Sequence, residues 1–274
     1  MTGCFFRIPA KLVDTIFRTS NGSGLAICSG IGRVCMGGNS CWVLAVLVGV
    51  GLLGIPLQVY GGGPGEREIP IRHIRTMIPI LGTTVDEHSQ PVGIVAEVNL
   101  EFTHRRDQEG LDVLFEETPG RFSPFAKLSV IHAIERVAAA AGLNPNSWTV
   151  RFILPYPGVT LYGESLSAMA ALNVVALAKN ERVDEDTVLT GTVTPDGALG
   201  VVGGVPLKIH AAHKKHFRKV VIPEELDVAD GDWETPFLME VTPVRSIKKA
   251  YFALTHHALR SITPPQPLAA SLTR

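Results

Sequence analysis

The feature that most limits how this chain can fold is an uncharged stretch in its N-terminal part. No charged residue occurs from Val34 to Gly65, and within that stretch Cys41 to Tyr60 reads CWVLAVLVGVGLLGIPLQVY. Twenty helical residues rise about 30 Å, which matches the hydrocarbon core of a bilayer. Trp42 and Tyr60 stand where aromatic residues anchor membrane helices. The stretch therefore predicts a transmembrane helix over 41–60 and a single-pass membrane location.

Two other interpretations of this stretch stay open. A cleaved signal peptide is disfavoured because forty residues precede the apolar run, although translation from Met36 would restore it. A buried core helix is disfavoured because the run is apolar on every face rather than along one stripe. The side of the membrane is not decided by positive charge, because Arg33 precedes the span and Arg67, Arg72 and Arg75 follow it.

We expect five segments along the chain. They are an N-terminal tail (1–40), the transmembrane helix (41–60), a linker (61–80), a folded domain (81–262) and a disordered tail (263–274). The sequence GGGPG at 61–65 supports the linker, because glycine adds backbone freedom and proline blocks a helix. Three prolines among residues 264–267 support the disordered tail.

Composition narrows the class of protein. The chain is 46% hydrophobic and 19% charged, which excludes a wholly disordered polypeptide. Its net charge is −1, with +3 in residues 1–60, so no basic face large enough for nucleic acid is indicated. All four cysteines (Cys4, Cys28, Cys35 and Cys41) precede the folded domain. Their spacing is wider than in most zinc sites and no histidine lies near, so we expect no metal.

Beyond the linker the sequence shows both strand and helix patterns, and we expect an α+β domain there. Strands are expected at 92–102, 111–115, 148–154, 187–194 and 219–222. The first two are interpreted as an antiparallel pair around a polar turn, and a hairpin turn is expected at 195–197. Helices are expected at 125–141, from 165 to 179, after Pro206, and at 247–259.

Two short motifs each precede a predicted helix. One is Tyr162-Gly163-Glu164-Ser165, and the other runs from Gly203-Gly204 to Lys208. Here the sequence resembles the proteolytic domain of the Lon protease family, in which a nucleophilic serine follows an Asp-Gly-Pro turn and a lysine base follows a Gly-Gly pair. Ser165 and Lys208 are 43 positions apart, and aligning the serines brings the lysines into register without a gap.

The resemblance extends over about half of the chain. Its other shared positions are Leu189-Thr190-Gly191, Thr194, Gly197, Ala211-Ala212-His213, residues 220–225 and residues 241–244. It implies a Lon-type fold, a polypeptide substrate, no cofactor and a homo-oligomeric ring. It also implies that Ser165 and Lys208 form a catalytic dyad and that Thr190 orients the Lys208 amine.

The residues themselves support this chemistry. A serine hydroxyl is a weak nucleophile until a base takes its proton, and a lysine amine serves only when it is uncharged. The pKa of such a lysine must fall from about 10.4 toward 7, which burial can achieve. The residues flanking Lys208 are apolar: Val201, Val202, Val205, Leu207 and Ile209.

Ser165 is also expected at a helix start, where backbone N–H groups and the helix dipole stabilise an oxyanion. Gly163 would let the backbone approach the substrate, so Gly163, Glu164 and Thr190 join the predicted site as oxyanion or orienting residues. The plainer alternative is that Ser165 is a helix cap and Lys208 a solvated helix residue.

Several positions depart from the family pattern. Leu166-Ser167 replaces Ala-Gly after the serine, Thr192 replaces a glutamate, and Tyr162-Gly163-Glu164 replaces Asp-Gly-Pro. A leucine beside the nucleophile would narrow the space for a substrate backbone and so change, lower or abolish activity. Ser167 is a rival nucleophile that fits the lysine register worse by two positions.

Other features exclude further functions. His210, His213 and His216 recur every three residues, but they lack acidic or cysteine partners and predict a solvated helix rather than a metal site. No G-x-x-x-x-G-K-[ST] motif occurs, so no ATP site is expected on this chain. The leading hypothesis is a membrane-anchored, ATP-independent Lon-like serine endopeptidase. The alternative is a non-catalytic, membrane-tethered binding or scaffold protein that retains the Lon-like fold.

Overall fold

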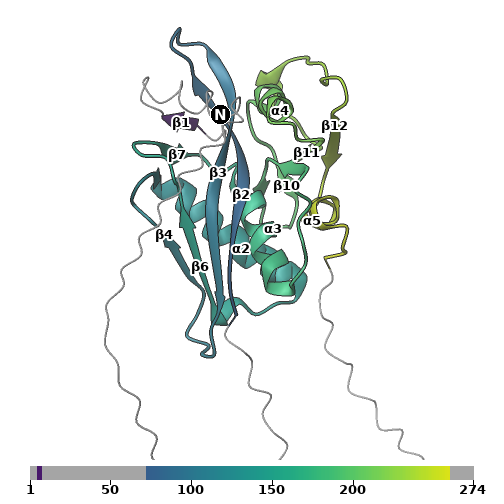
Figure 1. Cartoon of the computed structure of the whole chain (residues 1–274). Helices are drawn as coiled ribbons and strands as arrows, with labels where there is room; N and C mark the ends of the chain where they lie inside the picture. Colours follow the sequence, from purple (N-terminus) through teal and green to yellow (C-terminus); the bar gives the residue numbers. More distant parts are fainter. Residues whose placement is uncertain (1–4, 8–71, 260–274) are drawn as a thin grey trace, which may run out of the picture.

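The computed structural model describes residues 5–7 and 72–259 (Figure 1). The predicted transmembrane helix at 41–60 and the predicted tail at 263–274 lie outside the described residues, and of residues 1–40 only β1 (Phe5–Arg7) is described. None of the helices within the described ranges has the length and apolar character to cross a membrane. The predicted single-pass membrane location is accordingly wrong for the described part of the chain.

A long β-hairpin forms the centre of the large sheet. β2 (Arg72–Val85) pairs antiparallel with β3 (Pro91–His104) along its whole length. Residues 72–80, predicted as linker, therefore form the first part of β2. Charged residues and Pro79 hide the strand pattern there, but every second residue (Ile74, Thr76, Ile78 and Ile80) lies on one face, and that face becomes buried toward Ile80.

In the described residues the large sheet has seven strands, in the order β4-β6-β3-β2-β1-β7-β5. The remaining members are β4 (Asp112–Phe115), β5 (Arg121–Phe122), β6 (Trp148–Ile153) and β7 (Thr160–Tyr162). The predicted antiparallel pairing of 92–102 with 111–115 is wrong. β6 lies between these strands, antiparallel to β3 and parallel to β4.

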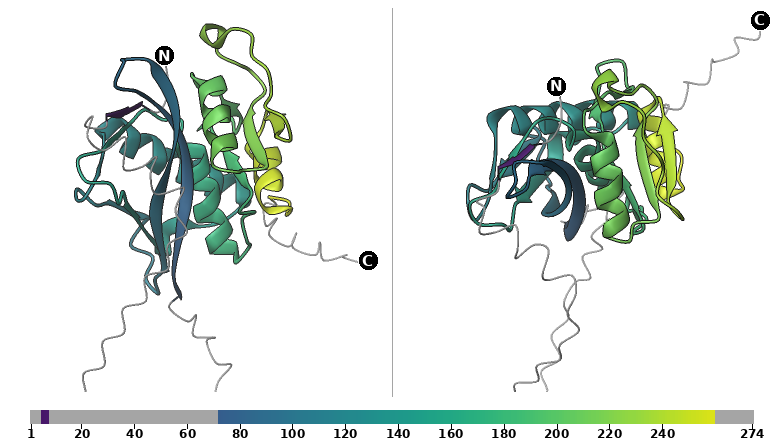
Figure 2. Two further views of the ribbon diagram at one scale, coloured as in Figure 1. Left: turned by 45° about the horizontal axis from the view of Figure 1, so that its top comes forward. Right: turned by 90° about the horizontal axis from the view of Figure 1, so that it is seen from above.

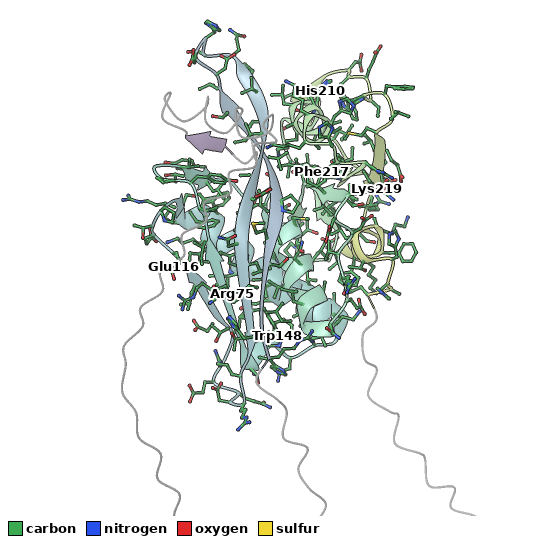
Figure 3. All side chains as sticks on the ribbon, viewed as in Figure 1. Arg75, Glu116, Trp148, His210, Phe217 and Lys219 are labelled. Atoms are coloured by element: carbon green, nitrogen blue, oxygen red, sulfur yellow. The ribbon has the colours of Figure 1, made fainter. Side chains whose placement is uncertain are left out.

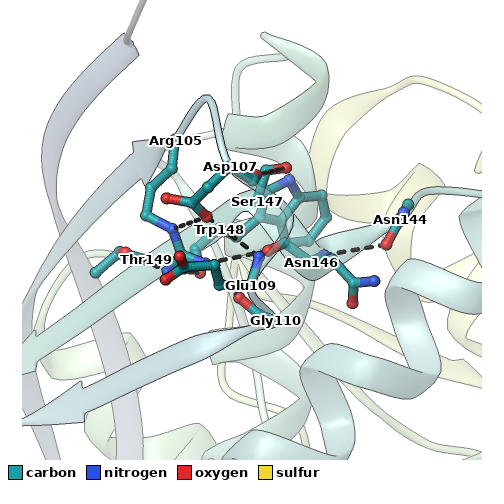
Figure 4. Close-up of polar contacts among 9 residues, drawn as sticks. All are labelled: Arg105, Asp107, Glu109, Gly110, Asn144, Asn146, Ser147, Trp148 and Thr149. Atoms are coloured by element: carbon teal, nitrogen blue, oxygen red, sulfur yellow. Dashed lines mark hydrogen bonds and ion pairs between the residues drawn. The ribbon is translucent and has the colours of Figure 1, made fainter.

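Arg105 explains why the chain does not fold straight back after β3 (Figure 4). Its backbone N–H donates to the carbonyl of Ser147 (2.7 Å), in the 3-10 turn η1 (Pro145–Ser147). Its guanidinium donates to Thr149 Oγ1 (2.9 Å) and to Asp107 Oδ1 (2.9 Å). Further acceptors are the carbonyl oxygens of Gly110, Asn146 and Trp148. These bonds hold the segment across the end of β6, so β4 adds beyond β6.

Two helices pack against each other and against the large sheet (Figure 1). α2 (Pro124–Ala141) begins after Ser123, whose hydroxyl accepts from the N–H of Ala126 (3.2 Å), and ends at Gly142. α3 (Ser167–Lys179) is buried at every position from Ser167 to Ala176. Its many alanines allow α2 and β2 to approach it closely. The predicted helix start at 165 is two residues early.

A second, parallel sheet has the order β12-β11-β8, formed by β8 (Thr187–Leu189), β11 (Lys219–Pro223) and β12 (Glu240–Val244). α4 (Val205–Lys214) lies between this sheet and the curved β2–β3 hairpin, as Figure 2 shows. α5 (Ile247–Thr255) packs on β8 and β12. A 3-10 turn, η2 (Val228–Asp230), lies in the connection from β11 to β12.

The predicted strand 187–194 is in fact two strands. β8 joins β11, whereas β9 (Thr192–Val193) turns away to form a short antiparallel hairpin with β10 (Leu199–Gly200), around the predicted turn. The N–H of Thr190 still donates to Val221 of β11, and the break falls at Gly191, whose N–H and carbonyl bond to Ser165 and Ala168 instead of continuing the ladder. The resulting mixture of helices and small sheets agrees in outline with the predicted α+β class.

Candidate active site

Ser165 lies between β7 and α3, two residues before the helix begins, and it is only 1% exposed. Its carbonyl accepts from the N–H of Gly191 (3.0 Å), and the Gly191 carbonyl accepts from the N–H of Ala168 (3.2 Å). These bonds fix the start of α3 against the break between β8 and β9. Gly163 has a φ of +83°, so the turn before Ser165 uses a conformation that favours glycine.

Lys208 is the fourth residue of α4, and its side chain is fully buried. A hydrogen bond of 3.1 Å joins its Nζ to Ser165 Oγ. A second, of 3.2 Å, joins the same Nζ to Thr190 Oγ1. Thr190 is also fully buried, and its backbone N–H donates to the carbonyl of Val221 on β11 (3.1 Å). The structure therefore places the hydroxyls of two predicted residues, Ser165 and Thr190, at the amine of the third, Lys208.

The surroundings of Lys208 are largely apolar. Of the flanking residues named from the sequence, Val202, Val205 and Ile209 are buried together in one cluster, whereas Val201 and Leu207 are half-buried. The same cluster contains Leu81 from β2. Removal from water disfavours the charged form of an amine. This position is therefore suited to a lysine that has to act as a base.

Gly163 and Glu164, the other two residues of the predicted site, differ in their surroundings. Gly163 shapes the turn before Ser165, whereas Glu164 lies under the influence of Arg136 on α2. Partial burial raises the pKa of the Glu164 carboxyl, and the positive charge of Arg136 opposes that rise. The Arg136 guanidinium also donates to the carbonyl of Val193. The Glu164 carboxyl thus interacts electrostatically with a residue of α2.

Two departures from the family pattern can be placed. Leu166 is buried, and its side chain packs in the main hydrophobic core. Ser167 is the first residue of α3, is buried, and donates its backbone N–H to the carbonyl of Glu164 (2.9 Å). The Lys208 amine is hydrogen-bonded to Ser165, which precedes Ser167 by two positions.

Sequence reasoning missed Asp230, at the end of η2. Its Oδ1 accepts from the N–H of Gly204 (2.7 Å) and its Oδ2 from the N–H of Val205 (3.0 Å). These are the first N–H groups of α4, and Gly204 has no side chain with which to cap them. A helix that begins at a Gly-Gly pair needs a capping partner from elsewhere, but nothing local identifies that partner.

The predicted solvated helix face is where the sequence placed it. His210, His213 and His216 are all exposed, and in Figure 3 His210 lies on the same side of the molecule as Phe217 and Lys219. Among the described residues no group of three or more histidine, cysteine, aspartate or glutamate side chains is placed to hold a metal ion.

A groove of about 880 Å³ runs along another part of α3. Its lining includes Met169, Asn173 and Leu177 from that helix, residues of β2 from Arg72 to Pro79, and the segment 180–185. Met169 is the lining residue nearest in sequence to Ser165. The groove is therefore a neighbour of the Ser165 site along α3 and not the site itself.

Comparison with known proteins agrees with this geometry. Residues 129–249 match the family model described as the Lon protease (S16) C-terminal proteolytic domain, and this range contains Ser165, Thr190 and Lys208. The archaeal Lon protease of Archaeoglobus fulgidus is 30% identical over 133 residues, covering 47% of this chain and 21% of the relative. That of Thermoplasma acidophilum is 25% identical over 164 residues, covering 58% and 24%.

A bacterial relative matches over a shorter range. The Lon protease of Azorhizobium caulinodans is 30% identical over 109 residues, covering 39% of this chain and 12% of the relative. The matched part of the chain thus spans a quarter or less of the length of these relatives. Residues 129–249 belong to the Lon protease family, as its C-terminal proteolytic domain.

Proposed function

We propose that this protein is a serine endopeptidase that hydrolyses peptide bonds in polypeptide substrates, with Ser165 as nucleophile and Lys208 as general base. The observation that carries the proposal is the 3.1 Å hydrogen bond between Lys208 Nζ and Ser165 Oγ, formed where the lysine is fully buried. A base must lie within hydrogen-bond reach of the proton that it removes. The family of residues 129–249 gives the same reaction class.

Four steps follow from this arrangement. The lone pair of the uncharged Lys208 amine accepts the proton of Ser165 as Oγ attacks the carbonyl carbon of the substrate. The resulting ammonium donates that proton to the amine of the departing peptide, and an acyl-enzyme remains. Lys208 then takes a proton from water, which attacks the ester carbonyl, and returns the proton to Ser165 Oγ. Throughout, an N–H of the amine donates to Thr190 Oγ1, which orients the lone pair toward Ser165.

The start of α3 suits the negative charge that develops on the substrate oxygen. No side chain caps this helix terminus, and Ser165 lies two residues before it. The positive end of the helix dipole stabilises an oxyanion there, whereas the N–H groups of Ser167 and Ala168 already donate to the carbonyls of Glu164 and Gly191. Gly163 keeps side-chain bulk away from this turn. These features extend the proposal to Gly163 as an oxyanion residue.

Neither ATP nor a cofactor takes part in the proposed reaction. A Ser–Lys pair hydrolyses a peptide bond with water as the only other reactant. The chain contains no G-x-x-x-x-G-K-[ST] motif that would hold a nucleotide phosphate. We therefore propose ATP-independent cleavage of flexible polypeptides. From the similarity to the Lon family we also propose a homo-oligomeric ring as the working form.

The test compares cleavage of an unstructured polypeptide such as casein by the full chain and by its Ser165→Ala and Lys208→Ala variants. Each substitution is expected to lower kcat by about 10³-fold or more. Ser167→Ala tests the rival nucleophile, and Lys214→Ala, on the exposed end of the same helix, is the matched lysine control. Equal activity in all five proteins would eliminate the dyad.

The alternative is a non-catalytic binding protein that retains the fold, and a wide separation of the hydroxyl and the amine would have counted against the enzyme. Their separation of 3.1 Å supports the catalytic proposal instead. Retention of an unstructured polypeptide by the wild-type chain, with no cleavage and no effect of Ser165→Ala, would favour the alternative.

A further inference from the structure

The start of α4 is held from outside by a single carboxylate. Asp230 uses one oxygen for the N–H of Gly204 and the other for the N–H of Val205, at 2.7 and 3.0 Å. Pro206 has no N–H, so the N–H groups of Gly204 and Val205 are most of the backbone donors at this helix terminus that need a partner from outside the helix. Charge-assisted hydrogen bonds of this kind are stronger than neutral ones, and an anion is favoured at a helix N-terminus.

Gly204 connects this carboxylate to the buried lysine. The carbonyl of Gly204 accepts from the backbone N–H of Lys208 (3.1 Å), so the residue held by Asp230 also closes the first turn that presents Lys208. On its other side Gly204 lies against β2, where an added Cβ would come within 2.8 Å of Thr83 Cγ2. Its φ of +69° also favours glycine. The helix start is therefore clamped between Asp230 and β2.

Asp230 is itself held in place. Its backbone N–H donates to the carbonyl of Asp227 (3.0 Å), and the Asp227 side chain accepts from the N–H of Ala229 (3.0 Å), which closes η2. The same loop approaches Gly203, where an added Cβ would lie 3.3 Å from Asp227 Oδ2. The two glycines before α4 thus lie where this loop contacts the helix start closely.

We propose that Asp230 is a positioning residue, which fixes the register and tilt of α4 so that the Lys208 amine reaches Ser165 Oγ. This inference rests on the proposed peptidase function and adds a residue to it from a loop outside both motifs. Asp230 acts through Gly204 and the first turn of α4, without touching the substrate. Misplacing a catalytic group by about 1 Å can lower a rate about 100-fold. Loss of this cap is therefore expected to lower kcat and leave substrate binding unchanged.

The test uses the full chain with Asp230→Asn and Asp230→Ala. Asparagine keeps the shape and one acceptor oxygen, whereas alanine removes both. Asp232→Asn is the matched control, because it makes the same charge change on an exposed residue of the same loop. Hydrogen exchange of the amides in residues 203–208 reports the cap without any need for activity. Active sites are counted with a serine-reactive probe, so that kcat is expressed per competent site.

We expect faster amide exchange at residues 203–208 in both Asp230 variants. We also expect kcat per titrated site to fall between about 10- and 100-fold, with KM within about twofold of wild type, and Asp230→Asn to lose less than Asp230→Ala. Asp232→Asn should match wild type in each measurement. A variant that merely folds less completely would show fewer titrated sites with an unchanged kcat per site, and that result overturns the proposal.

Unchanged exchange at residues 203–208 also overturns it, because the cap would then not hold the helix start. Faster exchange together with unchanged kcat per site reduces Asp230 to a structural cap and rejects the positioning role. If the wild-type chain shows no Ser165-dependent turnover, the proposed function fails and the positioning role fails with it. The exchange measurement distinguishes that case from failure of the cap.

Discussion

At the scale of single residues, the site depends on one buried amine. Sequence reasoning predicted Ser165, Lys208 and Thr190, because each belongs to a local motif that can be aligned with a family. The structure places the Lys208 amine within hydrogen-bond distance of the hydroxyls of the other two. Asp230 could not be predicted in this way, because its contact with Gly204 is made across 26 positions of sequence. Local sequence patterns reveal motifs, whereas a helix cap that comes from a distant residue can be recognised only in the folded structure.

At this scale, substitution of Thr190 tests most directly whether its hydroxyl orients the Lys208 amine. Thr190→Val keeps the shape of the side chain but removes the hydroxyl that lies 3.2 Å from Lys208 Nζ. Losing one hydrogen bond worth about 1 kcal/mol is expected to lower kcat about fivefold or more. Thr190→Ser, which keeps the hydroxyl, should retain most of the activity. Steady-state kinetics at one pH measures both, and equal kcat values for the two variants would argue against an orienting role.

At the scale of elements, the connections between strands determine pairings that the sequence patterns do not predict. Helices α2 and α3 were predicted to within two residues at each end, because their apolar periodicity and end signals are local, whereas α5 ends at Thr255, four residues before the predicted end. The pairing of 92–102 with 111–115 was wrong, because Arg105 sends the chain across β6. The strand at 187–194 was divided by hydrogen bonds of Gly191 to the start of α3. Neither the contacts of Arg105 nor those of Gly191 can be predicted from the alternation of hydrophobic and polar residues.

Arg105→Lys tests the connection after β3. A lysine cannot reproduce the planar fork with which Arg105 contacts Asp107, Thr149 and three backbone carbonyls. We expect a loss of about 1.5 to 3 kcal/mol in the free energy of unfolding, measured by urea denaturation. Arg218→Lys, at an exposed ion pair with Asp186, should change that free energy by about 0.5 kcal/mol or less. Similar losses in the two variants would show that the Arg105 network contributes little.

The contact between the end of α3 and α5 predicts a pH dependence. Partial burial raises the pKa of Glu181, but hydrogen bonds from Lys179 and Tyr251 and the charge of Lys179 outweigh it and lower that pKa overall. A carboxyl whose pKa is lowered by folding adds stability above its unfolded pKa, about 4.3, and loses it as pH falls through the folded value. The free energy of unfolding of Glu181→Gln should therefore fall less steeply than that of wild type below about pH 4.5.

Urea denaturation between pH 3 and pH 7 measures this slope. Tyr251→Phe removes the hydroxyl that donates to Glu181, so it should reduce the same pH-dependent part of the stability. Identical slopes for wild type and Glu181→Gln would show that the Glu181 contacts do not stabilise the folded state.

At the scale of the whole molecule, two sheets and the helices between them bring distant segments to one point. Ser165 enters from the large sheet and α3, Thr190 from the edge of the small sheet, and Lys208 from α4 between the two sheets (Figures 1 and 2). Sequence patterns predicted most of these elements but not their order within the sheets. The membrane prediction rested on the length, apolarity and flanking aromatic residues of 41–60, and no helix of the described residues supports it.

The proposed ring gives a prediction at this scale. Light scattering coupled to size-exclusion chromatography should give a mass several times the 29.4 kDa of one chain. The mass should be independent of dilution across the range used for kinetics, because a closed ring satisfies every subunit interface. A mass of one chain in a preparation that cleaves polypeptides would show that the active form needs no ring.

Labelling with a serine-reactive fluorophosphonate, followed by mass-spectrometric mapping of the modified peptide, tests the central claim most directly. The full chain should be modified at Ser165, slowly because that residue is 1% exposed, and Lys208→Ala should abolish the modification. Modification of Ser167 instead, or labelling of Ser165 at an unchanged rate in Lys208→Ala, would contradict the assignment of Lys208 as the base that activates Ser165.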